Sequence, residues 1–240
     1  MQSYQNSQAI KQSFVDTALE HERADSFVKG LYWQREEKKG CNIGCWTKAE
    51  TGNHAVLALE MGVPESLLHL SDGLFEALPD PHYKAWSRRL ALAIPVGVDL
   101  SSNWAQVLRW ILSDQSWGLG VLAESMNTRA ALKAMADYYG HVEGASAPEP
   151  SDELTLAMLQ LKRDLAMWRQ WDEQALRDMR AARAAIELWN ARTNDPKSLA
   201  RAAWAARAAW SAWEAYTLAQ SDAVLEILKA AQPEKMLVGA

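Results

Sequence analysis

The fold of this chain follows most directly from the segment Arg201-Ala-Ala-Trp204-Ala-Ala-Arg207-Ala-Ala-Trp210-Ser-Ala-Trp213-Glu-Ala-Tyr216. Large side chains recur at every third residue, and alanine, the strongest helix former, fills most of the gaps. A similar segment, Arg180-Ala-Ala-Arg183-Ala-Ala, precedes this one in the chain. It lies within residues 151–192, which include no glycine or proline. Asn194-Asp195-Pro196, between the two stretches, is typical of a turn. We therefore predict a long antiparallel helical hairpin over residues 151–232.

Helical periodicity also runs through the N-terminal part of the chain. Apolar residues recur at helical spacing between Gly, Pro, Ser or Asn boundaries, and no segment alternates with the period of a strand. The expected helices cover residues 7–29, 54–61, 64–78, 82–93, 101–112 and 121–139. Residues 144–150, Gly-Ala-Ser-Ala-Pro-Glu-Pro, read as a linker. The sequence thus predicts an all-α protein with an N-terminal helical domain at 1–145, which includes a cysteine-containing loop, followed by the hairpin.

Composition narrows the classes of function. A net charge of −5 argues against a protein that coats DNA, so nucleic acid is a less favoured partner than protein. No run of about 18 apolar residues predicts a membrane span, and the N-terminus lacks the pattern of a signal peptide. Two cysteines do not make a disulfide framework. We expect a cytoplasmic protein without a membrane partner.

The most chemically suggestive segment is Gly40-Cys41-Asn42-Ile43-Gly44-Cys45, followed by His54. Cysteines four residues apart can direct both sulfurs at one ion, and zinc accepts thiolate, imidazole and carboxylate ligands. Cys41, Cys45 and His54 are therefore candidate zinc ligands. The fourth ligand would come from His69, Asp72 or Glu76. Two alternatives are buried cysteines that only pack beneath the glycines and reactive thiols.

A second candidate is a pocket lined by Asp72, Glu76 and Asp99. Asp99 ends the apolar connection Ile94-Pro95-Val96-Gly97-Val98-Asp99 and could be a polar group of such a pocket. The alternative is a core connection whose aspartate caps the next helix. No glycine-rich phosphate loop and no ordered nucleophile–histidine–acid set occurs in the sequence.

The order of motifs in the N-terminal half resembles a family of uncharacterised proteins from bacteria, prophages and phages. The residues that carry the resemblance are Gly40-Cys41-Asn42-Ile43-Gly44-Cys45, His54, Leu59-Glu60-Met61-Gly62-Val63-Pro64-Glu65, Leu74-Phe75-Glu76 and Ala93-Ile94-Pro95-Val96-Gly97-Val98-Asp99-Leu100. Members join this order to an alanine-rich tail of three-residue repeats, so the resemblance covers about residues 20–231. Members often carry a histidine shortly after the second cysteine, where this chain has Trp46-Thr47-Lys48. The resemblance implies an accessory role in a phage or mobile element, in the host cytoplasm.

The three-residue stripe itself is the candidate interaction surface, formed by Arg201, Trp204, Arg207, Trp210 and Trp213. A step of three residues falls short of a 3.6-residue turn, so the stripe winds around its helix. Its tryptophans and arginines would contact a partner, or they would pack inside the protein. The leading hypothesis is a non-enzymatic interaction protein that binds another macromolecule, such as a host defence component. The alternatives are a metal- or thiol-dependent enzyme or small-ligand protein centred on Cys41, Cys45 and His54, and a self-assembling, homo-oligomeric scaffold.

Overall fold

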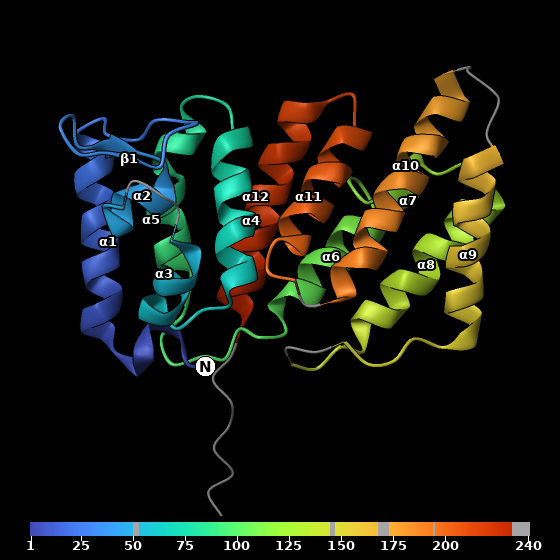
Figure 1. Ribbon diagram of the computed structural model, residues 1–240, viewed down its shortest axis with the longest axis horizontal. Helices are drawn as coiled ribbons and strands as arrows, with labels where there is room; N and C mark the ends of the chain where they lie inside the picture. The colour runs from blue at the N-terminus through green and yellow to red at the C-terminus, as the bar shows by residue number, and fades with distance from the viewer. Residues whose placement is uncertain (50–52, 145–146, 168–172, 194, 232–240) are drawn as a thin grey trace, which may run out of the picture. The chain divides into compact units, whose positions relative to one another are not determined.

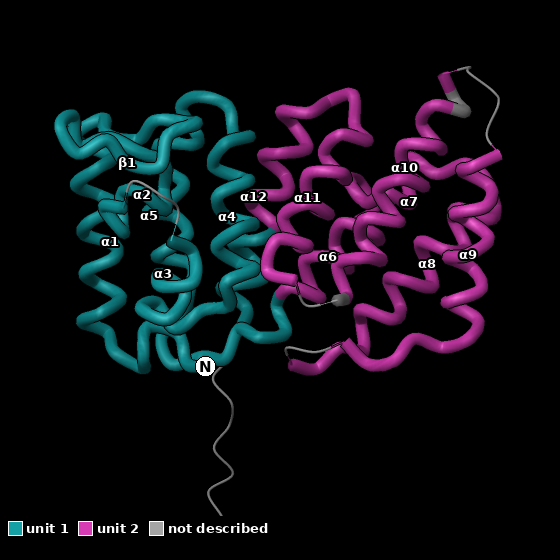
Figure 2. The backbone as a smooth tube through the Cα atoms, in the orientation of Figure 1, with its two compact units in different colours: residues 1–103, 224–240 teal, residues 104–223 magenta. Residues whose placement is uncertain are grey.

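The structure of the chain is a computed structural model that describes residues 1–49, 53–144, 147–167, 173–193 and 195–231. Almost all of its regular structure is α-helix (Figure 1), which confirms the predicted all-α fold. Contacts among the elements divide the chain into two compact units, which Figure 2 colours separately. The first unit contains Met1–Asn103 and Val224–Ala240, and the second contains Trp104–Ala223.

The first unit consists of short and medium helices and one small strand pair. Its elements are η1 (Ser3–Asn6), α1 (Gln8–Arg23), β1 (Trp33–Gln34), β2 (Lys39–Gly40), α2 (Asn42–Thr47), α3 (His54–Met61), α4 (Glu65–Ala77) and α5 (His82–Ala93). The strands β1 and β2 pair antiparallel, with Trp33 opposite Gly40. The sequence did not predict this pair, because two residues per strand are too few to produce an alternating pattern.

The core of the first unit lies where α4 packs against α3 and α5, and where α1 packs against α5. Trp86 of α5 is completely buried, and its Nε1 donates hydrogen bonds to the backbone and side-chain oxygens of Ser71 on α4. Tyr4 is also buried, and its hydroxyl donates a 2.8 Å hydrogen bond to the carbonyl of Ala91. Because the indole N–H of Trp86 and the hydroxyl of Tyr4 each have a hydrogen-bond partner, the burial of these aromatic side chains leaves neither polar atom unsatisfied.

The second unit contains the alanine-rich helices. Its elements are α6 (Asn103–Ser113), α7 (Leu119–Leu122), α8 (Met126–Gly140), α9 (Asp152–Met167), α10 (Glu173–Asn190), η2 (Ala191–Thr193), α11 (Ser198–Ala209) and the beginning of α12 (Trp213–Ala230). α10 and α11 pack against each other through buried alanines, which include Ala181, Ala185, Ala202 and Ala206. Alanine on both helices lets the two backbones approach closely. This pair is the helical hairpin at the centre of the unit.

The described residues of 151–231 contain four α-helices, and the second arm of the predicted hairpin is not one continuous helix. In the first arm, α9 ends at Met167 and α10 begins at Glu173; residues 168–172 lie outside the described part. In the second arm the helix stops at Trp210, whose backbone is extended (φ −92°, ψ 134°). The break turns the indole of Trp210 onto the ring of Tyr216, with centroids 5.7 Å apart and planes 17° from parallel.

The boundary between the two compact units follows Asn103, whereas the sequence predicted a linker between domains at residues 144–150. Helices α7 and α8 pack against α10, and α8 also packs against α9, so the segment before the linker joins the hairpin. The buried carboxylate of Asp178 on α10 accepts hydrogen bonds from the backbone N–H groups of Glu124 and Ser125 and from the hydroxyl of Thr128. This carboxylate ties the start of α8 to α10.

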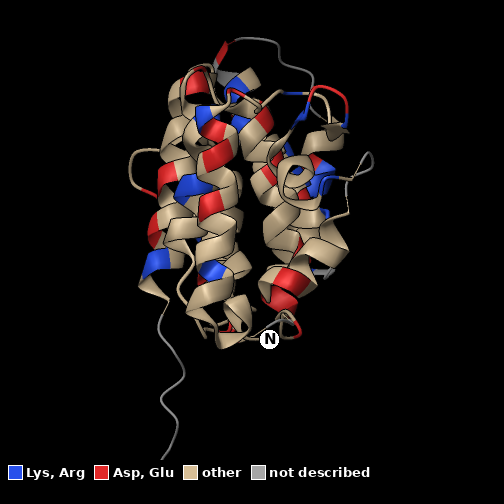
Figure 3. Ribbon diagram, turned by 90° about the vertical axis from the view of Figure 1, so that its left-hand side faces the viewer, with Lys and Arg blue, Asp and Glu red and all other residues tan. Residues whose placement is uncertain are grey.

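Charged side chains of both signs are interspersed on the helices that face the viewer in Figure 3. Such a mixed surface gives no broad field of one sign that would attract a nucleic acid over this face. Within the described ranges, no helix combines the length and the apolar character that crossing a bilayer requires.

Candidate functional site

The cysteine segment folds as a tight turn followed by the short helix α2. Its glycines are required by packing, since a Cβ added at Gly40 or Gly44 would overlap the backbone carbonyl oxygen of Tyr32. Cys41 is the N-cap of α2, and its sulfur accepts a 3.4 Å hydrogen bond from the N–H of Gly44. The spacing of the motif therefore has a structural explanation that does not involve a ligand.

Both cysteines are free and buried. The Cys45 Sγ lies 3.5 Å from the carbonyl oxygen of Gly40 and 4.0 Å from that of Ser26. Burial raises the pKa of both thiols to about 12, and at Cys41 the negative charge of Asp72 adds to the effect. A thiol with such a pKa stays protonated at neutral pH. It is therefore a poor nucleophile.

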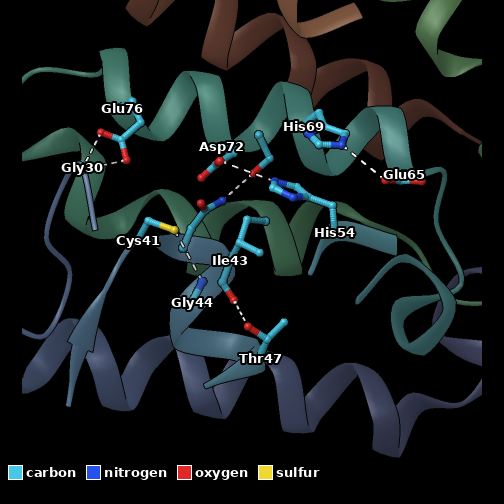
Figure 4. Close-up of polar contacts among 12 residues, drawn as sticks. Gly30, Cys41, Ile43, Gly44, Thr47, His54, Glu65, His69, Asp72 and Glu76 are labelled. Carbon is cyan, nitrogen blue, oxygen red and sulfur yellow. Dashed lines mark hydrogen bonds and ion pairs between the residues drawn. The ribbon is translucent and has the colours of Figure 1, made fainter. Parts of the chain in front are cut away.

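His54, Asp72 and His69 form a polar cluster between α3 and α4 (Figure 4). The Nε2 of His54 lies 3.4 Å from the Oδ2 of Asp72, and the His54 side chain is only 5% exposed. The rings of His54 and His69 stack with centroids 3.9 Å apart, and His69 Nε2 lies 3.3 Å from the Oε1 of Glu65. The Nε2 of His54 and the Oδ1 of Asp72 are buried without a hydrogen-bond partner among the described residues.

The structure brings some of the predicted site residues together and separates others. Cys41, His54 and Asp72 lie in one neighbourhood, with Tyr32 edge-on to the His54 ring. Glu76, one turn along α4, instead accepts hydrogen bonds from the N–H of Gly30 at 2.9 and 3.1 Å, and burial raises its pKa. Tyr32 is a member of the cluster that the sequence did not reveal, because it precedes the first residue of the motif, Gly40, by eight residues.

Asp99 lies apart from this cluster. Its carboxylate accepts a 2.9 Å hydrogen bond from the N–H of Ser101 and lies 3.4 Å from the N-terminal amine of Met1. These contacts lower the pKa of Asp99. The side chain thus has the local role of an aspartate at the start of a turn.

A metal centre needs three or more ligand side chains that converge on one point. No such group of His, Cys, Asp or Glu occurs in the part of the chain that the structure describes. Zinc at Cys41, Cys45 and His54 stays a prediction from sequence. In the described arrangement, His54 and Asp72 lie at ion-pair distance, and the two buried thiols of the cysteine segment are held in the protonated form.

The three-residue stripe divides between the inside and the outside of the second unit. Trp204 is 57% exposed and Arg201 is exposed, whereas Arg207 is only 1% exposed. Trp210 and Trp213 are half-buried; Trp210 stacks on Tyr216, and the Trp213 ring lies edge-on to that of Trp204. A stripe that winds around a helix necessarily presents some members to the core and others to solvent.

The exposed members lie in a groove of about 530 Å³ between α10 and α11. Its charged lining comes from Arg180, Arg183 and Arg201 with one carboxylate, Glu187, and its aromatic lining is Trp204. The alanines that complete it are Ala184, Ala205, Ala208 and Ala209. We call these residues the α10–α11 groove. The predicted surface omitted Arg180 and Arg183, although their Arg-Ala-Ala repeat was the signal that could have identified them.

Comparison of the chain with protein-family models, with curated proteins and with solved structures gives no match.

Proposed function

We propose that this protein is a non-enzymatic interaction protein that binds an acidic helical segment of another protein in the α10–α11 groove. The observation that carries the proposal is the placement of three exposed arginines and an exposed tryptophan over an alanine-lined floor. Arginine and tryptophan are the side chains that most often dominate the energetics of protein interfaces.

Charge favours an acidic partner. The groove is lined by three guanidinium groups, one of which (Arg201) pairs with Asp195, and by one carboxylate, whereas the whole chain has a net charge of −5. Planar guanidinium groups pair with carboxylates through two parallel hydrogen bonds. These basic residues are confined to one groove and do not form the extended basic surface typical of nucleic-acid binding, so an acidic protein segment fits better than an oligonucleotide.

The shape of the floor favours a helix. Ala205, Ala208 and Ala209 lie on one face of α11, and Ala184 faces them from α10. Small side chains on two neighbouring helices leave room for the backbone of a third helix to approach. Trp204, at the edge of this floor, can cover an apolar side chain of the incoming helix. This arrangement corresponds to recognition of an amphipathic helix in a groove.

The resemblance to phage and prophage proteins adds a proposal about context. An accessory protein of a phage or mobile element acts on components of the host, so the acidic helix would belong to a host protein, for example a component of a defence system. The raised pKa values of Cys41 and Cys45 support a binding role over thiol chemistry.

The test uses the full chain and two synthetic helical peptides of equal length. One carries glutamates and the other lysines at the polar positions, with identical leucines and alanines elsewhere. Fluorescence anisotropy should show salt-sensitive binding of the acidic peptide. Arg180→Glu combined with Arg183→Glu should abolish it, and Trp204→Ala should weaken it about tenfold or more.

Arg163→Glu is the matched control, because Arg163 is an exposed arginine of α9 outside the groove and should leave binding unchanged. Equal binding of both peptides, or equal loss in the Arg163 variant, would contradict the proposal. Tighter binding of a single-stranded oligonucleotide would replace it with a nucleic-acid function. A stable oligomer that Trp204→Ala dissociates would replace it with the scaffold alternative.

A further inference from the structure

A second hollow, of about 450 Å³, lies in the first unit where the end of α1 meets the β1–β2 hairpin and the end of α2. The residues that matter in its lining are His21, Ser26, Trp33, Arg35, Lys38 and Lys48. None of them belongs to the cysteine–histidine cluster or to the α10–α11 groove. A volume of this size is in the range of small-molecule sites and exceeds that of a single inorganic ion.

Within the described residues, the cations of this hollow have no acidic partner. Among the described residues, no carboxylate lies within ion-pair distance of Arg35, Lys38 or Lys48. The neighbouring cations are paired: Lys39 with Glu37, Lys84 with Asp25, and Arg88 with Glu22. One carboxylate, that of Glu20, lines the hollow, so the cations outnumber it by three to one.

The floor of the hollow is polar and buried. His21 is 8% exposed and Ser26 is 7% exposed. The Nδ1–H of His21 donates to the carbonyl of Thr17 at 2.8 Å, which leaves Nε2 as the second polar atom of the ring. The hydroxyl of Ser26 has no hydrogen-bond partner among the described residues. Trp33, edge-on to His21 at 5.8 Å between ring centroids, forms an apolar wall.

We propose that this hollow binds a small organic phosphate. A phosphate dianion can accept hydrogen bonds from one planar guanidinium and from two ammonium groups at once. The hydroxyl of Ser26 can donate a further hydrogen bond. The volume beyond the phosphate is available to the organic part, which would lie along Trp33.

The test measures binding of three probes to the full chain: inorganic phosphate, ribose 5-phosphate and AMP. Ligand-observed ³¹P NMR and thermal unfolding should both report binding of the two esters, and added NaCl should weaken it. Arg35→Gln combined with Lys48→Gln should weaken binding at least about tenfold, because two charge-assisted contacts are lost. Lys39→Gln is the matched control, since Lys39 lies in the same hairpin, pairs with Glu37 and does not line the hollow.

Far-UV circular dichroism must show that the double variant is folded, and the single Lys48→Gln variant provides a milder change if it is not. The proposal is overturned if wild type binds none of the probes, or if Lys39→Gln loses as much affinity as the double variant. If inorganic phosphate binds as tightly as both esters, the inference that the hollow also contacts the organic group of the ligand is wrong.

Discussion

Arg207 Nη1 donates a 2.8 Å hydrogen bond to the Oε1 of Gln220, and both side chains are buried inside the second unit. Burial lowers the pKa of this guanidinium to about 10. The guanidinium also lies 5.9 Å from the centre of the Trp213 ring, at cation–π distance. An arginine from the middle of the repeat is thus a structural group of the interior, and its neighbours Arg201 and Trp204 face solvent.

Arg207→Ala should lower the free energy of unfolding by about 2–4 kcal/mol, because it leaves a cavity and an unpaired buried amide at Gln220. Arg201→Ala, on the same helix, should cost less than about 1 kcal/mol, since Arg201 is exposed and its ion pair with Asp195 is open to solvent. Urea unfolding of both variants provides the measurement. Equal losses would show that Arg207 is not in the described position.

Trp210→Ala should cost about 2–4 kcal/mol, because the indole packs against Tyr216 and against Trp117, with 5.2 Å between the indole centroids. Trp204→Ala should cost less than about 1 kcal/mol, as expected for a side chain that is mostly exposed. Thermal unfolding followed by circular dichroism would separate the two variants. A larger loss for Trp204 would contradict the inside–outside division of the stripe.

Gly44→Ala should prevent stable folding of the first unit or cost more than about 3 kcal/mol. The added methyl group would overlap the backbone oxygen of Tyr32, and backbone cannot move aside as a flexible side chain can. Gly140→Ala is the control, since a Cβ there meets only ordinary contacts with Arg109 at 3.5 Å. Soluble yield and urea unfolding of both variants test the expectation, which fails if they behave alike.

The two cysteine thiols should resist alkylation in the native state at pH 8 and react once the protein is unfolded. The folded state keeps their protons up to pH about 12, whereas the unfolded state loses them above the ordinary pKa of 9.0. Each thiol therefore stabilises the folded state less as the pH rises from 9 towards 12, by up to about 1.4 kcal/mol per pH unit. Cys41→Ala combined with Cys45→Ala should make the fall in stability shallower over this range. Rapid native labelling at pH 8 would contradict the prediction.

Much of the helical structure could be predicted from local signals. The helix expected over 121–139 is divided into α7 and α8, with Ser125 as the N-cap of α8, whereas Asn53 and Gly62 bracket the expected helix α3 as its N-cap and C-cap. Each of these signals acts within a few residues, so it can be recognised without tertiary structure. The end of the helix at Trp210 could not be predicted in this way, because no glycine or proline marks it.

The arrangement of the candidate site residues could be predicted less well, because it depends on tertiary structure. The motif predicted that Cys41 and Cys45 would act together, but Cys41 lies beside Asp72 and Cys45 faces the carbonyl oxygens of Gly40 and Ser26. His54 and Asp72 were both singled out, yet their approach depends on how α3 packs against α4. The hollow near Arg35 and Lys48 joins residues from three elements and had no signal in the sequence.

By itself, the sequence determined that the chain is helical, where several helices of the N-terminal half begin and end, and that alanine fills its last third, with arginine and tryptophan at fixed steps. These properties follow from backbone preferences and side-chain size, which act locally. Only the tertiary structure decided which stripe residues are buried, because a period of three drifts around a helix of 3.6 residues per turn. The neighbouring helices then determine which part of the turn is covered, so Arg207 lies inside and Trp204 outside.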